Sequence, residues 1–155
     1  MLCKDFIILL ISSGFFGTIM GAYFGTVQYR MVADKILITS HCFCPSCNTT
    51  LSIWFQIPII SWLCLKGKCY YCKKPIPIKY FFIELSFLLF YLVSFLFYYK
   101  RPFLLVSIWI FFIAFMLLVN CKKHFLSAIK AFSIFLVYHV IYGSVFIIIY
   151  YALTM

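Results

Sequence analysis

Four cysteines have the residue type and spacing of metal ligands, and they form two CxxC pairs: Cys44 with Cys47, and Cys69 with Cys72. Two such knuckles separated by about twenty residues are typical of a structural zinc site with four thiolate ligands. Pro45 and the segment 73–75 (Lys-Lys-Pro) supply turn residues for the knuckles. The spacing therefore predicts one bound zinc ion. A disulfide pair or unrelated free cysteines are the alternatives.

Basic residues surround the knuckles. Zinc bound by four thiolates carries a net charge of about −2, and four lysines are close enough in sequence to offset it: Lys66, Lys68, Lys73 and Lys74. Cys42 and His41 lie beside the first knuckle and are alternative ligands. The CxxC pairs are preferred because two ligands on one tight turn suit the tetrahedral geometry of zinc.

The rest of the chain is strongly apolar. Of its 155 residues, 66% are hydrophobic and 10% are charged, and the mean hydropathy is +1.11. A soluble domain is nearer half apolar, so the composition indicates a membrane protein with one small loop outside the bilayer. The formal net charge of +10 then reflects membrane topology and an anionic lipid surface. No basic helix or stacking platform supports binding to nucleic acid.

Four apolar segments have about the length, roughly twenty residues, that a helix needs to cross the hydrocarbon core: 6–27, 80–99, 103–120 and 131–153. Helices keep their backbone hydrogen-bonded within lipid, so we expect an all-α membrane protein with about four transmembrane helices. Its parts would be a first helix with a glycine-rich face in 1–28, a cytoplasmic double-CxxC zinc loop in 29–79, and a three-helix region in 80–155. The segment 100–102 (Lys-Arg-Pro) predicts a tight hairpin between the second and third spans.

The distribution of basic residues predicts the orientation. Ten of the thirteen Lys and Arg residues lie in the cysteine loop and in the connection between the third and fourth spans, against Lys4, Lys100 and Arg101 on the opposite side. This asymmetry predicts a cytoplasmic loop with both termini outside, and a reducing cytoplasm favours thiolate ligands over disulfides. A cleaved signal peptide is the alternative for the first span. Its length, its basic C-terminal flank and the lack of a small-residue cleavage site argue against it.

Further residues around the knuckles occur in a specific order. Between and after the CxxC pairs come Leu51, Ile57-Pro58, Ser61-Trp62-Leu63, Gly67-Lys68, Pro75-Ile76, Lys79-Tyr80 and Glu84-Leu85; upstream are Gly21, Tyr23, Val27, Tyr29 and Arg30. In this order they resemble the N-terminal region of bacterial type IV prepilin peptidases, which are membrane enzymes that trim and N-methylate pilin-like proteins. The resemblance covers about residues 14–90.

The resemblance implies a multi-pass protein of the bacterial inner (cytoplasmic) membrane that takes part in processing type IV pilins and type II secretion pseudopilins. The family catalyses with two aspartates. Here Asn120 stands at the place of the first aspartate and Ser127 at the place of a proline that follows it, while the family's Gly-x-Gly-Asp segment has no counterpart. Gly25 and Ala22 also replace the family's usual Asn and Ser.

The acidic residues of the chain do not supply a catalytic pair. They are Asp5, Asp34 and Glu84, and the two aspartates lie at opposite ends of the first span, about 30 Å or more apart if that helix is straight. Aspartyl chemistry needs two carboxylates that share a proton, and the amide of Asn120 cannot take it. We therefore expect a pseudoenzyme rather than a stand-alone protease. The alternatives are a non-catalytic zinc-loop assembly or binding protein, or one half of a split prepilin peptidase.

The expected partners follow from the same resemblance. They are membrane lipids, and either pilin-like substrates or a separate chain that carries the catalytic half. S-adenosylmethionine is implied only by the family's methyl transfer, because no loop for that cofactor is recognisable.

Several polar or small residues in the spans have both a structural and a functional reading. Glu84 complements a helix N-terminus, or it is a buried acid that pairs with Arg30 or a loop lysine and contacts a substrate amine. Gly17, Gly21 and Gly25 allow close packing within the chain, or they form a docking groove for another transmembrane helix. His139, in the middle of the fourth span, hydrogen-bonds within the bundle or relays protons.

Overall fold

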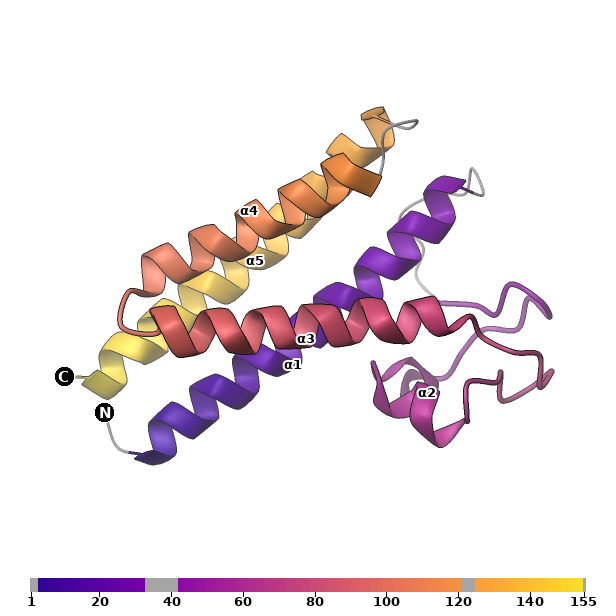
Figure 1. Ribbon diagram of the computed structural model, residues 1–155, viewed down its shortest axis with the longest axis horizontal. Helices are drawn as coiled ribbons and strands as arrows, with labels where there is room; N and C mark the ends of the chain where they lie inside the picture. Colours follow the sequence, from indigo (N-terminus) through magenta and orange to yellow (C-terminus); the bar gives the residue numbers. More distant parts are fainter. Residues whose placement is uncertain (1–2, 33–41, 121–124, 155) are drawn as a thin grey trace. The chain divides into compact units, whose positions relative to one another are not determined.

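The computed structural model of the chain describes residues 3–32, 42–120 and 125–154, and it is all-helical (Figure 1). In chain order the elements are α1 (Cys3–Val32), η1 (Ile53–Gln56), α2 (Ile60–Cys64), α3 (Ile78–Tyr98), α4 (Pro102–Asn120) and α5 (Phe125–Thr154). The short elements η1 and α2 lie in the cysteine loop between α1 and α3. The expectation of an all-α protein is confirmed.

Three of the described helices are long and apolar enough to cross a membrane: Lys4–Arg30 in α1, Ile78–Tyr98 in α3 and Ile129–Leu153 in α5. They coincide with the expected spans 6–27, 80–99 and 131–153. The fourth expected span, 103–120, falls on α4, whose apolar stretch among the described residues, Pro102–Met116, is shorter. The described residues thus contain three candidate spans rather than four.

The connection between α3 and α4 is the tight hairpin that the sequence predicts. Helix α3 ends at Tyr98 and α4 begins at Pro102, a proline position that suits the first turn of a helix because no backbone N–H is needed there. The Arg101 N–H donates to the Tyr98 carbonyl at 2.8 Å and closes the turn.

The chain forms two compact units that each contain parts of α1 and α3. One unit comprises the beginning of α1 to Gly17, the end of α3 from Leu89, and helices α4 and α5; the other is Thr18–Leu88. The units are cut midway along helices. The division by sequence into 1–28, 29–79 and 80–155 therefore stays a prediction.

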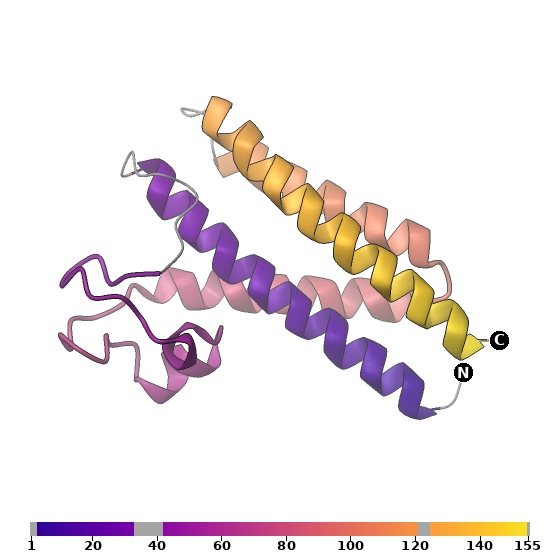
Figure 2. The ribbon, with the colours of Figure 1, turned by 180° about the vertical axis from the view of Figure 1, so that it is seen from behind.

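In the unit that contains α4 and α5, these two helices lie side by side (Figures 1 and 2). Aromatic residues fill its core, and Tyr91, Phe95, Trp109 and Phe135 are fully buried. Gly143 permits the close approach of α5 to α4, because a Cβ atom there would lie 2.9 Å from a Val106 methyl carbon. The outer faces are also apolar, as is expected for helices in contact with lipid.

Candidate metal centre

The first CxxC knuckle is a tight turn stabilised by the backbone. Phe43 and Thr50 form an isolated antiparallel bridge. Inside the bridge the Cys44 N–H donates to the Thr49 carbonyl at 3.0 Å, and the Asn48 N–H donates to the Cys44 carbonyl at 2.8 Å. Asn48 has φ 53°, a left-handed conformation that asparagine tolerates better than most residues.

The second knuckle repeats this hydrogen-bonding pattern residue for residue. Lys68 and Pro75 form the bridge, the Cys69 N–H donates to the Lys74 carbonyl at 2.9 Å, and the Lys73 N–H donates to the Cys69 carbonyl at 3.0 Å. Lys73 occupies the left-handed position with φ 58°. The two knuckles are therefore equivalent local structures, each built on one of the CxxC pairs.

The knuckles bring their four sulfur atoms together. The Sγ atoms of Cys44, Cys47, Cys69 and Cys72 all lie within 4.8 Å of one another, and those of Cys44 and Cys72 are 3.8 Å apart. A tetrahedral site with Zn–S bonds of about 2.3 Å requires S···S distances of about 3.8 Å. The arrangement is slightly more open than such a site, and it is a group that could hold a metal ion.

The geometry of the loop also bears on the alternatives to this ligand set, which are a disulfide and the neighbouring residues Cys42 and His41. The six cysteines of the loop between α1 and α3 are free, and 3.8 Å between the Sγ atoms of Cys44 and Cys72 is far longer than a disulfide bond of about 2.05 Å. Cys42 is half-buried but is not among the four clustered sulfurs, and its carbonyl accepts the Leu51 N–H. His41, the other alternative, lies outside the described residues.

The thiols differ in acidity. Hydrogen bonds from the Thr49 side chain and then its backbone lower the pKa of Cys47 to about 6. For Cys69, desolvation raises the pKa, but hydrogen bonds from the Cys72 and Tyr71 backbone outweigh it and the net shift is downward. The Lys74 backbone hydrogen bond lowers the pKa of Cys72, yet desolvation together with the other three sulfurs raises it to about 11. A bound cation would stabilise the thiolate forms of these cysteines.

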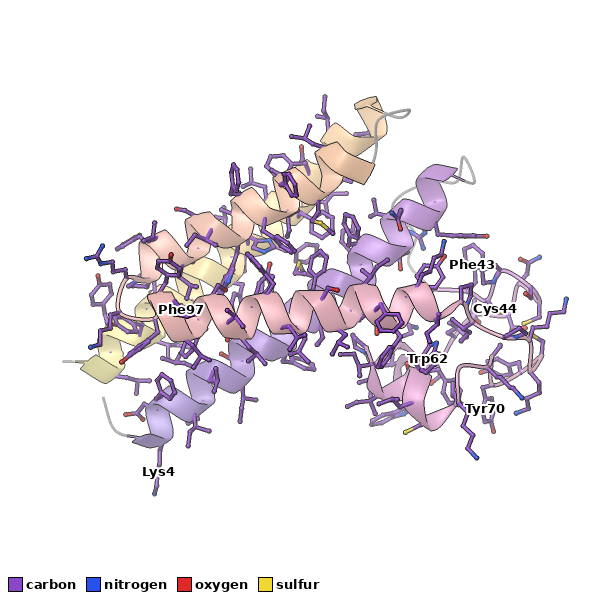
Figure 3. All side chains as sticks on the ribbon, in the orientation of Figure 1. Lys4, Phe43, Cys44, Trp62, Tyr70 and Phe97 are labelled. Atoms are coloured by element: carbon purple, nitrogen blue, oxygen red, sulfur yellow. The ribbon has the colours of Figure 1, made fainter. Side chains whose placement is uncertain are left out.

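Exposed lysines and aromatic residues lie next to the second knuckle in the sequence. Lys66, Lys68, Lys73 and Lys74 are all exposed, and the Lys73 ammonium lies 4.8 Å from the centre of the Tyr70 ring. The Tyr70 ring in turn stacks on Phe55 of η1, with centroids 4.5 Å apart. Phe43, Cys44 and Tyr70 can be located in Figure 3.

Glu84 attaches the loop to the first turns of α3. Its Oε2 atom accepts the Ile59 N–H at 2.6 Å. Ile59 has φ 61°, which is unfavourable for a β-branched residue, and it immediately precedes α2. The described contacts of Glu84 thus include a loop backbone N–H, a partner that sequence reasoning missed because no local pattern marks it.

Trp62 makes a second attachment (Figure 3). Its ring lies 5.0 Å from the ring of Phe81 on α3. The ring also covers Gly67, where a Cβ atom would lie 2.7 Å from the ring and where φ is +66°. Both the space and the backbone therefore require glycine just before the second knuckle.

Two of the three singled-out glycines of α1 lie against α3. A Cβ atom on Gly21 would lie 2.9 Å from the Glu84 Cα atom and 3.0 Å from the Phe87 Cβ atom, and one on Gly25 would lie 3.1 Å from the Tyr80 ring. Gly17 is also buried. The close approach is between helices of the same chain, as in the packing interpretation of the glycine pattern.

The remaining sequence-predicted residues lie elsewhere. Arg30 is buried in the last turn of α1. Asn120 is the last residue of α4, and Asp34 lies outside the described residues. In the unit that contains α4 and α5, His139 is buried; its Nδ1 atom donates to the Phe135 carbonyl at 2.8 Å and its Nε2 atom accepts from the Tyr91 hydroxyl. The structural interpretation of His139 is confirmed.

Comparison with known proteins gives one matching family and several relatives. The sequence model of one protein family, the bacterial peptidase A24 N-terminal domain, matches residues 15–98. The prepilin leader peptidase/N-methyltransferase of Vibrio cholerae serotype O1 is 37% identical over 78 residues, 44% of this chain and 30% of the relative. The protein of the same name from Myxococcus xanthus is 33% identical over 69 residues, 44% of this chain and 21% of the relative. The protein of that name from Neisseria gonorrhoeae is 48% identical over 42 residues, which are 27% of this chain and 15% of the relative.

The matched residues therefore span less than a third of each of these relatives. No solved structure matches the chain. The match of the family model, over residues 15–98, includes the cysteine loop.

Proposed function

The chain belongs to the family of the bacterial peptidase A24 N-terminal domain, and on that premise we propose that it is a zinc-loop membrane protein of prepilin processing that does not cleave peptides by itself. The observation that carries the proposal is the convergence of four cysteine sulfurs within 4.8 Å in a loop attached to an apolar helix. The relatives reported above are named prepilin leader peptidase/N-methyltransferase.

The metal in this proposal is zinc, held by Cys44, Cys47, Cys69 and Cys72. Zinc suits a set of four thiolates and has no redox chemistry, so its contribution would be a structural cross-link between the two knuckles. The equivalent backbone turns direct both pairs of sulfurs to one point. The exposed lysines beside them would offset the charge of about −2 on the filled site.

The proposed topology has four spans, with α4 as the third, and both termini outside the cytoplasmic membrane. The asymmetry of Lys and Arg supports a cytoplasmic cysteine loop. Its free cysteines are compatible with a reducing compartment.

The proposal excludes peptide hydrolysis by these 155 residues alone. Their acids are Asp5, Asp34 and Glu84. The Glu84 carboxylate already accepts a backbone N–H of the loop, and a lone acid cannot fill both roles of an aspartyl pair. The partner is then either a pilin-like protein held by a non-catalytic binding or assembly module, or a separate chain that supplies the aspartates of a split peptidase.

The test is incubation of the purified protein, in detergent, with a prepilin substrate. We expect the leader to remain intact, and a prepilin peptidase that carries both aspartates serves as the positive control. Clear cleavage by the protein alone would falsify the non-catalytic proposal, provided that a substitution in this chain abolishes it and so excludes a contaminating protease.

A second arm distinguishes the two kinds of partner. If a chain that carries the Gly-x-Gly-Asp segment restores cleavage on mixing, the split-peptidase form is supported, and Asn120→Asp is expected to raise the rate. Co-purification of a pilin-like protein without cleavage in any mixture supports the binding module.

A further inference from the structure

The segment 53–64, which contains η1 and α2, exposes large apolar side chains that the metal centre does not use. The exposed fractions are 79% for Ile53, 75% for Trp54, 58% for Ile60 and 54% for Leu63. All four side chains are more than half exposed and lie within eleven residues of the chain.

The attachments of α2 to α3 place this segment along the axis of α3. Trp62 packs on Phe81, and the N–H of Ile59 is bound by Glu84. Phe81 and Glu84 are three and six residues after Ile78, the first residue of α3, and so lie about 4.5 and 9 Å along the helix. Ile59 and Trp62 therefore lie beside the first two turns of this candidate membrane-spanning helix, and η1 packs on α2.

The backbone of this segment is suited to a partly apolar environment. The Phe55 N–H donates to the Ser52 carbonyl at 2.9 Å, and the Ser61 N–H to the Ile57 carbonyl at 3.0 Å. The Gln56 side-chain amide donates to the Leu51 carbonyl at 2.7 Å. Non-helical backbone is tolerated at membrane depth when its polar groups are satisfied by the protein in this way.

The charges around the segment match an anionic bilayer surface. Lys66, Lys68 and Lys79 are exposed on either side of the second knuckle, and Lys79 belongs to the first turn of α3. Lysines at this level meet lipid phosphates, while tryptophan is enriched at the boundary between headgroups and acyl chains.

From these contacts we infer that segment 53–64 inserts into the membrane leaflet beside α3, with Ile53, Trp54, Ile60 and Leu63 at the boundary between anionic headgroups and acyl chains. The inference rests on α3 crossing the membrane, as proposed above. It adds that the loop is not free in solution. The two knuckles are held at the bilayer surface, where the chain of a transmembrane partner would leave the membrane.

The test uses the emission of Trp54 in vesicles of phosphatidylcholine and phosphatidylglycerol. The chain has three tryptophans, so the component of Trp54 is obtained by subtracting the spectrum of a Trp54→Phe variant from that of the unmodified protein. This single change, at an exposed side chain, avoids disturbing Trp62 and Trp109. We expect a blue-shifted component, quenched by bromines high on the acyl chains and poorly quenched by aqueous acrylamide.

A matched probe reports on α3 itself. Leu89, twelfth of the 21 residues of α3 and 53% exposed, is replaced by Trp in the Trp54→Phe background. We expect its added component to be quenched best by bromines near the chain ends. Suppose that the Leu89→Trp component is quenched in this way but Trp54 is quenched by acrylamide as strongly as free tryptophan. Segment 53–64 is then in water, and the inference is overturned in favour of a protein-facing surface. If the Leu89→Trp component is not quenched by lipid, α3 does not cross the bilayer, and the inference falls together with the proposed topology.

Discussion

The chemistry of this chain lies in side chains on two equivalent backbone turns. Each knuckle places its first cysteine in two backbone hydrogen bonds and a left-handed residue four positions later, Asn48 or Lys73. The turns are maintained by backbone contacts within each knuckle, so each pair of sulfurs is positioned locally. In the proposed zinc site, the ion would join the two pairs.

Loss of one ligand is expected to abolish metal binding. We predict about one zinc ion per chain for the purified protein and almost none for Cys44→Ser or Cys69→Ser, because three thiolates leave a structural site incomplete. Elemental analysis of protein purified without chelator measures the zinc content.

Cys64→Ser is the matched control. Cys64 is exposed and is not one of the four clustered sulfurs, so this variant should keep its zinc. A Cys44→Ser variant with undiminished zinc would show that the ligand set is wrong.

The carboxylate of Glu84 is expected to contribute to stability as a hydrogen-bond acceptor. In Glu84→Ala the half-buried Ile59 N–H loses its acceptor, which costs about 1–3 kcal/mol. In Glu84→Gln the amide oxygen can accept the same bond, so the loss should be smaller. Denaturant unfolding in mixed micelles, together with proteolysis of the loop, measures both variants. Equal behaviour of Glu84→Ala and the unmodified protein would remove Glu84 from the attachment of the loop.

At the scale of elements, the packing of α1 on α3 depends on what lies opposite each glycine. Gly21 faces the backbone of Glu84 and the Cβ atom of Phe87, whereas Gly25 faces the ring of Tyr80. Backbone atoms cannot move without shifting a helix, but a tyrosine ring can rotate. A side chain added at Gly21 should therefore be tolerated less well than one added at Gly25, one helical turn away.

The two glycines are predicted to respond differently to the same substitution. Gly21→Ala should destabilise the protein by about 1–3 kcal/mol, because the added methyl group overpacks the helix crossing. Gly25→Ala should be within about 1 kcal/mol of neutral, since the helix propensity of alanine offsets a small ring movement. Unfolding of both variants under identical detergent conditions tests this order, and a larger loss for Gly25→Ala would contradict it.

At the scale of the whole molecule, the orientation in the membrane decides which compartment contains the metal centre. We predict that an engineered Thr50→Cys thiol in the cysteine loop reacts with a membrane-impermeant maleimide only after the cells are permeabilised. Thr50 is exposed and lies on the side with more Lys and Arg. Labelling is measured relative to the unmodified protein, whose own cysteines supply the background.

The Lys100→Cys variant is the opposite case. Lys100 is exposed in the hairpin between α3 and α4, which the proposed topology places outside, so its thiol should be labelled in intact cells. Reversed behaviour of the two variants would invert the topology, and with it the compartment of the metal centre.

The sequence by itself determined features that depend on local spacing and composition. The two CxxC pairs, the apolar segments that became α1, α3 and α5, and the hairpin at Pro102 were all predictable, because turn geometry and helix length follow from neighbouring residues. The order of residues around the knuckles was also enough to indicate the family that the comparisons show.

The tertiary structure decided which distant residues meet. Glu84 was recognised as an unusual acid, but only the structure shows it bound to Ile59. Gly21 and Gly25 formed a pattern that fitted either a partner or the chain's own α3, and only the structure shows α3 opposite them. Trp54 and Ile53 carried no signal until their exposure was known. These outcomes depend on contacts between residues more than twenty positions apart, and no local propensity or spacing encodes which of the available surfaces a helix will bury.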